Sequence, residues 1–292
     1  MKEIFEKFLS DKFRERTERI IIGIAIVSFL LHLFVIFLVS QNVIDISSKL
    51  TKSPISAIYT PFSFILVYEV FLLVFYLPRS ISIYIGKQYE IITLIVIRRI
   101  FKDIGNIEMS TSWFKLENDL QFTYDVITTL ILFLLIHLFY KKTEKHANED
   151  ALLEGKGKIS KFIKLKKSIA MVLIPVLVLL AIYSFSVWII SSIQDHWAHI
   201  TTFKNINNIF FEDFFMLLII IDVILLLFSF FYSDQFHKII RNSGFIISTI
   251  LIKLSFSVEG VVNNALIVGA VLFGYLILLT HNLYKNSSVS DS

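Results

Sequence analysis

The chain has 292 residues, of which 55% are hydrophobic and only 18% are charged. Soluble globular proteins average about 45–50% apolar and about 25% charged residues, so this composition argues against a soluble domain. The absence of cysteine excludes disulfides, thiolate metal sites and cysteine nucleophiles, and the net charge of +4 includes no basic block interleaved with aromatics of the kind that binds nucleic acid.

Apolar segments follow one another along most of the chain after a densely charged N-terminal segment, residues 1–19. Segments of about 18 or more apolar residues are long enough to cross a bilayer as helices. They are apolar all round, whereas membrane strands alternate apolar and polar residues. The sequence therefore predicts an all-α, polytopic transmembrane helix bundle with clear spans at 20–40, 54–77, 120–140, 168–190, 211–232 and 260–284, and a shorter one at 243–257.

Prolines mark several of the expected helix boundaries. Pro54 follows Ser53, a pattern typical of a helix start, and Pro78 is expected to end the same helix. Pro61 should kink it, because a proline inside a helix removes a backbone hydrogen bond. Pro175 is expected near the start of its span, where it costs little.

Segment 79–104 is apolar but carries seven charged residues, so it fits either a crossing helix or an amphipathic helix in the membrane plane. The distribution of Lys and Arg favours the crossing helix. Six of them precede the first span and nine lie in residues 141–167, so both regions should be cytoplasmic and an even number of spans should separate them. We expect about eight spans with both termini inside; the alternative is seven spans, with 79–104 in the membrane plane.

This topology divides the chain into five parts. They are a charged cytoplasmic tail (1–19), a first four-helix half (20–140), a basic cytoplasmic loop (141–167), a second four-helix half (168–284) and a C-terminal tail (285–292). The loop is the expected linker because it is long, rich in lysine and contains two glycines.

Ionisable residues inside spans are costly and are therefore the candidate functional residues. Glu69 and Lys87 lie at equal distances from Pro78, and Asp222 and Lys253 lie at equal distances from the ends of the hairpin expected around 233–242. We expect each acid to pair with the base at its own depth, as an ion-pathway group or as a structural contact between helices. The secondary candidates are Glu90, Arg98, Arg99 and Asp125.

Cofactor and metal chemistry receive little support. His32 and His137 could bind a haem between two helices, but each is better explained as a single histidine in a packed span. Residues 195–213 combine histidines and acids with Trp197, which is more typical of a polar interfacial segment than of a metal site. We therefore expect no cofactor and no metal.

The last span contains two pairs of small residues four apart, Ala265 with Gly269 and Ala270 with Gly274. This spacing permits close helix packing, either within the chain or in a homo-oligomer.

The charged residues at bilayer depth favour a membrane transport protein, a channel or carrier for a small ion or proton. The alternative is a non-catalytic membrane scaffold or accessory subunit in which the charged pairs are structural. An enzyme is less favoured, because no nucleotide, hydrolase or metalloprotease motif is present. The expected location is a bacterial cytoplasmic membrane, with the lipid bilayer, a small ion or proton and a second copy of the chain as partners and no nucleic acid.

Overall fold

The computed structural model describes residues 10–43, 54–104, 117–153, 157–198, 206–232, 236–258 and 260–290. The elements in these ranges are helices: α2 (Asp11–Ser40), the 3-10 helix η2 (Pro54–Ile58), α3 (Tyr59–Tyr76), α4 (Ile81–Ile104), α5 (Glu117–Leu153), α6 (Gly157–Ala198), α7 (Ile206–Tyr232), α8 (Phe236–Ser255) and α9 (Gly260–Ser290). The all-helical prediction is confirmed for this part of the chain.

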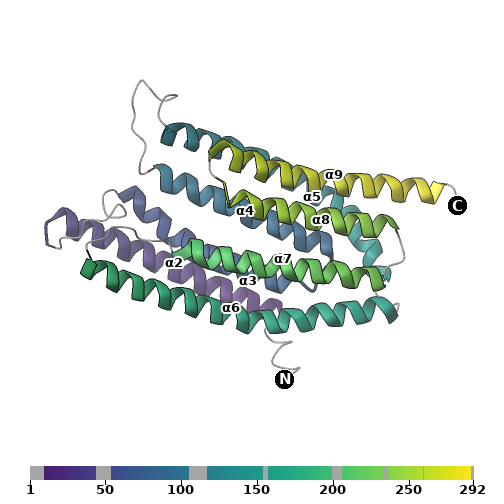
Figure 1. The fold of residues 1–292 in the computed structure, drawn as a ribbon, viewed down its shortest axis with the longest axis horizontal. Coiled ribbons are helices and arrows are strands. Elements are labelled where there is room, and N and C mark those ends of the chain that lie inside the picture. The colour runs from purple at the N-terminus through teal and green to yellow at the C-terminus, as the bar shows by residue number, and fades with distance from the viewer. Residues whose placement is uncertain are drawn as a thin grey trace.

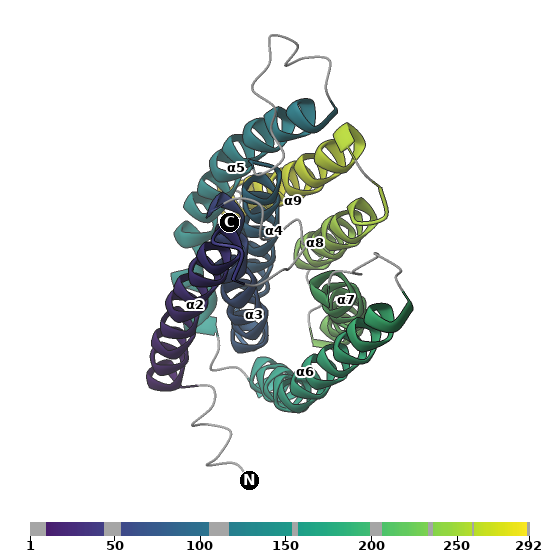
Figure 2. The same ribbon diagram turned by 90° about the vertical axis from the view of Figure 1, so that its left-hand side faces the viewer.

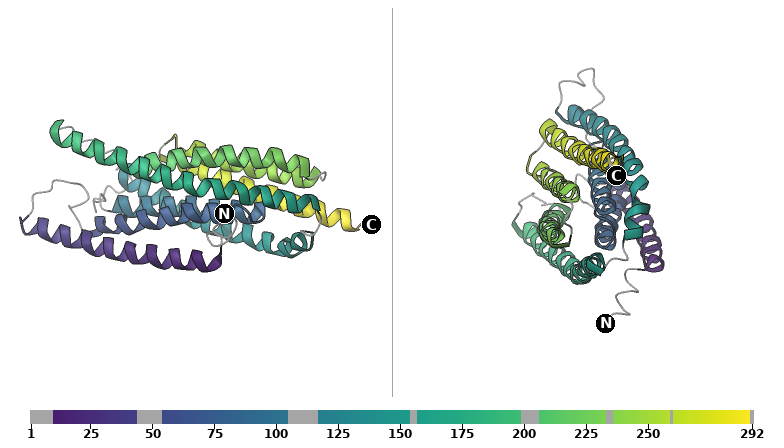
Figure 3. Two further views of the ribbon diagram at one scale, coloured as in Figure 1. Left: turned by 90° about the horizontal axis from the view of Figure 1, so that it is seen from below. Right: turned by 90° about the vertical axis from the view of Figure 1, so that its right-hand side faces the viewer.

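The helices lie side by side along one direction (Figure 1). α4 lies inside the bundle and packs against α3, α5 and α8, and the view along the helices shows these neighbours around it (Figure 2). α9 packs against both α8 and α5, so helices of the two halves of the chain interleave. α2 lies at an edge of the bundle and contacts α3 and η2 (Figure 3).

Capping residues explain where two of the helices begin. Ser10 is extended and its hydroxyl accepts a hydrogen bond from the Phe13 backbone N–H at 3.3 Å, ahead of Asp11 in the first turn of α2. Ser80 accepts from the Ile83 backbone N–H at 3.3 Å just before α4. The charged segment 79–104 thus forms one continuous helix.

Within the described ranges, three helices are long and apolar enough to span a membrane: Asp11–Ser40, Asp119–Thr143 and Gly260–Lys285. Two more apolar helical segments, Thr60–Tyr76 and Met216–Phe231, are shorter.

Several predicted boundaries were wrong, and the reason is common to them. α5 continues to Leu153 and α6 starts at Gly157, so most of the expected loop 141–167 is helix. Lys, Glu and Ala are good helix formers whether or not they lie in lipid, so a helix can extend well beyond its apolar part. The same extension places Pro175 in the interior of α6 rather than near its start.

Pro61 also differs from the expectation. α3 begins at Tyr59, so Pro61 occupies the first helical turn, where a backbone N–H would have no partner within the helix. Instead of a kink, the segment has a 3-10 turn, η2, followed by α3.

The bundle has an apolar core, but it also exposes many large apolar side chains and buries many polar ones. Leu30, Leu130 and Phe231 are among the exposed apolar side chains. α8 shows both features: it exposes Ile240, Ile247 and Leu254, and it buries Asn242, Ser248, Thr249 and Ser255 beside the apolar Phe245, Ile246 and Ile252.

Candidate functional site

Asp222 is a buried acid near the middle of α7, and it is 3% exposed. Its Oδ2 accepts a hydrogen bond from Nε2 of Gln88 on α4 at 3.0 Å. One turn before Gln88, the buried Tyr84 hydroxyl interacts electrostatically with Asp222. Among the described residues this hydroxyl has no hydrogen-bond partner of good geometry.

A lysine from a third helix completes what we call the Asp222 cluster: Tyr84, Gln88, Lys166 and Asp222. Lys166 on α6 is 4% exposed, and its Nζ donates to the Arg79 carbonyl oxygen at 3.0 Å. It interacts electrostatically with Asp222 and with Arg241. Lys166 precedes the predicted span 168–190, and burial, reinforced by Arg241, lowers its pKa to about 8.

The depth match predicted for Asp222 and Lys253 was wrong. α8 begins at Phe236, seven residues earlier than expected, so Lys253 lies in its last turn. At about 1.5 Å per residue, Asp222 is roughly 15 Å and Lys253 roughly 26 Å from the shared hairpin. The start of α8 was misplaced because its first turns carry polar residues, namely His237, Lys238 and Arg241.

The structure brings Glu69, Lys87 and Glu90 together near the turn between α3 and α4. Glu69 lies seven residues before the end of α3 and Lys87 six residues after the start of α4, so their depths match. The Lys87 Nζ bonds Glu90 Oε2 at 2.6 Å, and Glu69 interacts electrostatically with both residues. The side chains of Lys87 and Glu90 are about a fifth to a third exposed, so this group lies at the margin of the bundle.

Arg99 and Asp125 form the strongest ion pair of the described residues, which we call the Arg99 clamp together with Gln121, Asn263 and Asn264. The guanidinium of Arg99 on α4 bonds both carboxylate oxygens of Asp125 on α5, at 2.5 and 2.6 Å. It also donates to the side-chain oxygens of Asn263 and Asn264 on α9, and Gln121 donates to Asp125 at 2.7 Å. The clamp therefore joins three helices.

Both asparagines lie in the first turns of α9, which begins at Gly260. Arg98, the neighbour of Arg99, is also buried.

Between the clamp and the Asp222 cluster lies a third polar contact, which the sequence analysis missed. The Tyr89 hydroxyl and Ser248 Oγ are 2.8 Å apart, and Ser248 donates to the Ala270 carbonyl oxygen at 2.6 Å. Since the single Ser248 proton is used there, Tyr89 is the donor to Ser248. Thr93, one turn further along α4, donates to the Tyr89 carbonyl oxygen.

Gly274 is what makes room for Tyr89, because a Cβ at position 274 would overlap the Tyr89 hydroxyl. We expect Gly274→Ala to lower the free energy of unfolding in detergent by about 1–3 kcal/mol, the usual cost of overpacking. Gly269→Ala is the matched control on the same helix, since a Cβ there meets nothing within 4 Å. Equal effects of the two changes on the unfolding midpoint would contradict this packing.

The remaining candidates have structural explanations or lie outside the described side chains. The His32 Nδ1 lies 2.6 Å from Thr60 Oγ1 and so joins α2 to the start of α3, while His137 is exposed. The acids and histidines at 195–213 belong to a region whose side chains are not described. Among the described residues, no three His, Asp or Glu side chains are arranged to hold a metal ion.

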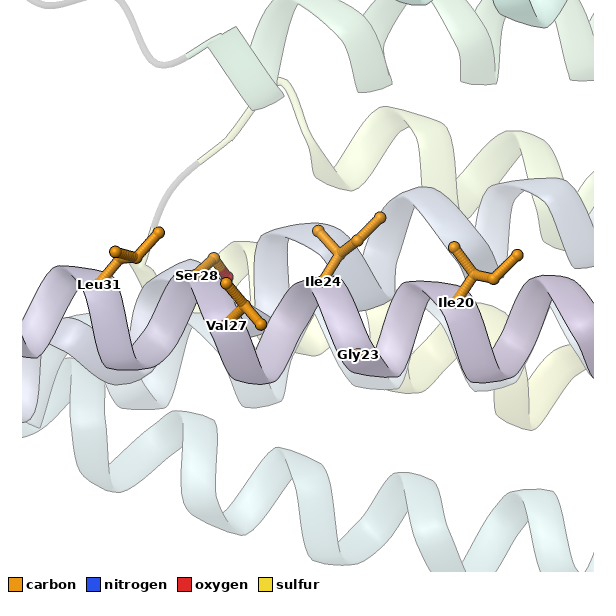
Figure 4. Close-up of a pocket in the computed structure, with 6 residues that line it drawn as sticks. All are labelled: Ile20, Gly23, Ile24, Val27, Ser28 and Leu31. Carbon is orange, nitrogen blue, oxygen red and sulfur yellow. The ribbon is translucent and has the colours of Figure 1, made fainter.

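A shallow surface groove of about 430 Å³ follows α2 between Ile20 and Leu31. Figure 4 shows its lining side chains, among which only Ser28 carries a polar atom. The Ser28 hydroxyl donates to the Ala25 carbonyl oxygen of its own helix. The groove therefore presents only apolar groups to its surroundings.

Comparisons of the chain with models of known protein families, with curated proteins and with solved structures find no match. The functional argument therefore rests on the chain's own residues.

Proposed function

We propose that this protein is an integral membrane transport protein that moves protons, or another small cation, through its helix bundle. Asp222 is the group that takes up and releases the ion. The observation that carries the proposal is this carboxylate, buried among three helices and hydrogen-bonded to a neutral amide.

The exposed apolar surface and the polar side chains buried between helices support membrane insertion. Exposed Leu, Ile and Phe side chains would be costly in water but cost nothing in lipid, while buried polar groups find partners between helices. Three helices already have the length and apolarity of spans, and α4, packed within the bundle, supplies a crossing in the eight-span arrangement. In this arrangement both termini and residues 141–167 face the cytoplasm, in a bacterial cytoplasmic membrane.

The position of Asp222 suits an ion-carrying carboxylate. It lies about 15 Å from the inner end of α7, about halfway through a hydrocarbon core of about 30 Å. The buried Tyr84 hydroxyl, which interacts electrostatically with Asp222, is a further polar group at this depth. In the proposed step the carboxylate binds a proton delivered by water from one side and returns it to water on the other.

Polar groups continue from this cluster along the inner face of α4. The polar path along α4 reaches Arg99, near the outer end of this helix, and covers about 22 Å. Before Arg99 it includes the buried residues Tyr84, Gln88, Tyr89 and Thr93. Proton relays through membranes use such series of polar side chains, with water between them.

Topology can be tested with single cysteines, because the chain has none of its own. We expect Arg79→Cys, at an exposed position, to react with an impermeant thiol reagent only from the cytoplasmic side. Ser257→Cys, also exposed, should react only from outside. If α4 did not cross, the number of crossings between the two sites would be even, and both would be labelled from the same side.

The test of the proposed function is flux in proteoliposomes. A potassium diffusion potential, negative inside, should drive acidification of vesicles containing the purified protein, measured with an internal pH dye, at a rate well above that of empty vesicles. The assay is repeated with sodium and potassium gradients at constant pH. Absence of flux in every arm would contradict the proposal and favour the scaffold alternative.

A further inference from the structure

A cleft between α8 and α9 gathers cationic and aromatic side chains at the end of the bundle where α8 begins. Its volume is about 90 Å³, enough to hold several water-sized groups. The polar side chains lining it are His237, Arg241, Thr280, His281 and Tyr284, and its walls are completed by Phe236, Ile240 and Ile277. No acidic residue is present among the described residues that line it.

Hydrogen bonds orient the cationic side chain. Arg241 can only donate, so its Nη1, 3.3 Å from His281 Nε2, makes that ring nitrogen the acceptor. The other nitrogen, Nδ1, then carries the proton and donates to the His237 carbonyl oxygen at 3.1 Å. The His281 ring and the Asn242 side-chain oxygen, which accepts from Arg241 Nε and Nη2 at 3.3 Å each, hold the Arg241 guanidinium at the cleft.

Aromatic stacking fixes the opposite wall. The His237 ring lies 5.1 Å from the His281 ring and 5.5 Å from the Tyr284 ring, centroid to centroid. Both contacts come from α9, so the cleft is a preformed feature of the α8–α9 pair, whose helices lie side by side (Figure 1).

Basic side chains predominate among the described charged residues near the cleft, although the Asp222 carboxylate also interacts with Lys166. Arg241 interacts repulsively with Lys166, and Lys285 and His237 interact electrostatically with His281. A local gathering of cations raises the concentration of anions around it, and a bound anion relieves the repulsion among them. Arginine in particular matches the geometry of phosphate oxygens through its forked N–H groups.

The surroundings of the cleft are apolar and exposed, with Phe236 68% and Ile240 44% exposed. In the proposed topology this end faces the cytoplasmic leaflet, where basic pockets between helices bind anionic headgroups. We propose that the cleft is a phosphate-binding site that takes the headgroup of an anionic phospholipid. The proposal requires membrane insertion but does not depend on transport.

Binding can be measured as the rise in melting temperature of the detergent-solubilised protein on adding ligand. The arms are phosphatidylglycerol, phosphatidylcholine and soluble glycerol 3-phosphate, with wild type, Arg241→Gln, Thr280→Trp and Lys161→Gln. Thr280→Trp fills the cleft and keeps its charges. Lys161→Gln is the control, since it removes one positive charge from an exposed position on α6.

We expect phosphatidylglycerol to stabilise wild type and Lys161→Gln, and phosphatidylcholine, with its compensating positive charge, to have little effect. Both cleft variants should bind phosphatidylglycerol at least about ten-fold more weakly, the factor expected for one hydrogen bond to a charged group. An equal response to glycerol 3-phosphate would identify the phosphate group alone as the ligand. The proposal is overturned if the cleft variants respond as Lys161→Gln does, or if no phosphate compound stabilises the wild type.

Discussion

Asp222→Asn is expected to abolish proton flux while leaving the protein folded. Asparagine has nearly the same shape and can still accept the hydrogen bond from Gln88, but it cannot bind and release a proton. The rate of vesicle acidification should fall to that of empty liposomes. The measurement is flux per protein after equal reconstitution, with the unfolding midpoint in detergent as the check on folding.

Ser229→Ala is the matched control for this change. Ser229 is also buried on α7, about two turns further on, but its hydroxyl donates to the Leu226 carbonyl oxygen of its own helix. Its loss should leave flux near the wild-type rate. If Asp222→Asn keeps wild-type flux, Asp222 has no place in the mechanism.

Asp125→Asn should be the most destabilising of the carboxylate substitutions. The Asp125 side chain is fully buried and accepts two hydrogen bonds from Arg99, one from Gln121 and one from Asn264. Removing its charge leaves the Arg99 guanidinium without its counter-ion. Breaking a fully buried pair costs about 3–5 kcal/mol, and the 29% exposure of the Arg99 side chain places the expected loss near the lower limit.

Unfolding in detergent measures this loss, with Glu15→Gln as the control for the same chemical change at an exposed position. A double variant, Asp125→Leu with Arg99→Met, should recover part of the stability, because it leaves no uncompensated charge. Equal stability of Asp125→Asn and Glu15→Gln would show that the clamp does not hold α4, α5 and α9 together.

Hydropathy predicted the helices better than it predicted their ends. The apolar parts of α2, α5 and α9 are long enough to be recognised individually, and charge distribution indicated that segment 79–104 is a helix of the bundle. The ends of α5 and α6 and the start of α8 were misplaced, because Lys, Arg, Glu and His continue a helix beyond its apolar part without any change of backbone.

The charged candidates were easier to find than their partners. Glu69 with Lys87, and Arg99 with Asp125, drew attention because charge is rare inside spans. Gln88 did not, since neutral polar residues are common in spans and their role depends on which way the helix faces. That rotation is set by packing between helices distant in sequence, as when Gln88 meets Asp222 134 positions away.

Access of water to Asp222 tests the central claim most directly, because an ion can use this site only if it can reach it. In the cysteine-free chain, Asp222→Cys can be compared in native membranes with Leu225→Cys, a buried apolar position one turn away. The account predicts that a small, charged methanethiosulfonate reagent modifies position 222 at a rate at least about ten-fold above that at 225, since the polar path is hydrated and the apolar core is not. Equal lack of reaction at both positions would contradict transport through Asp222 and leave a dry structural bundle.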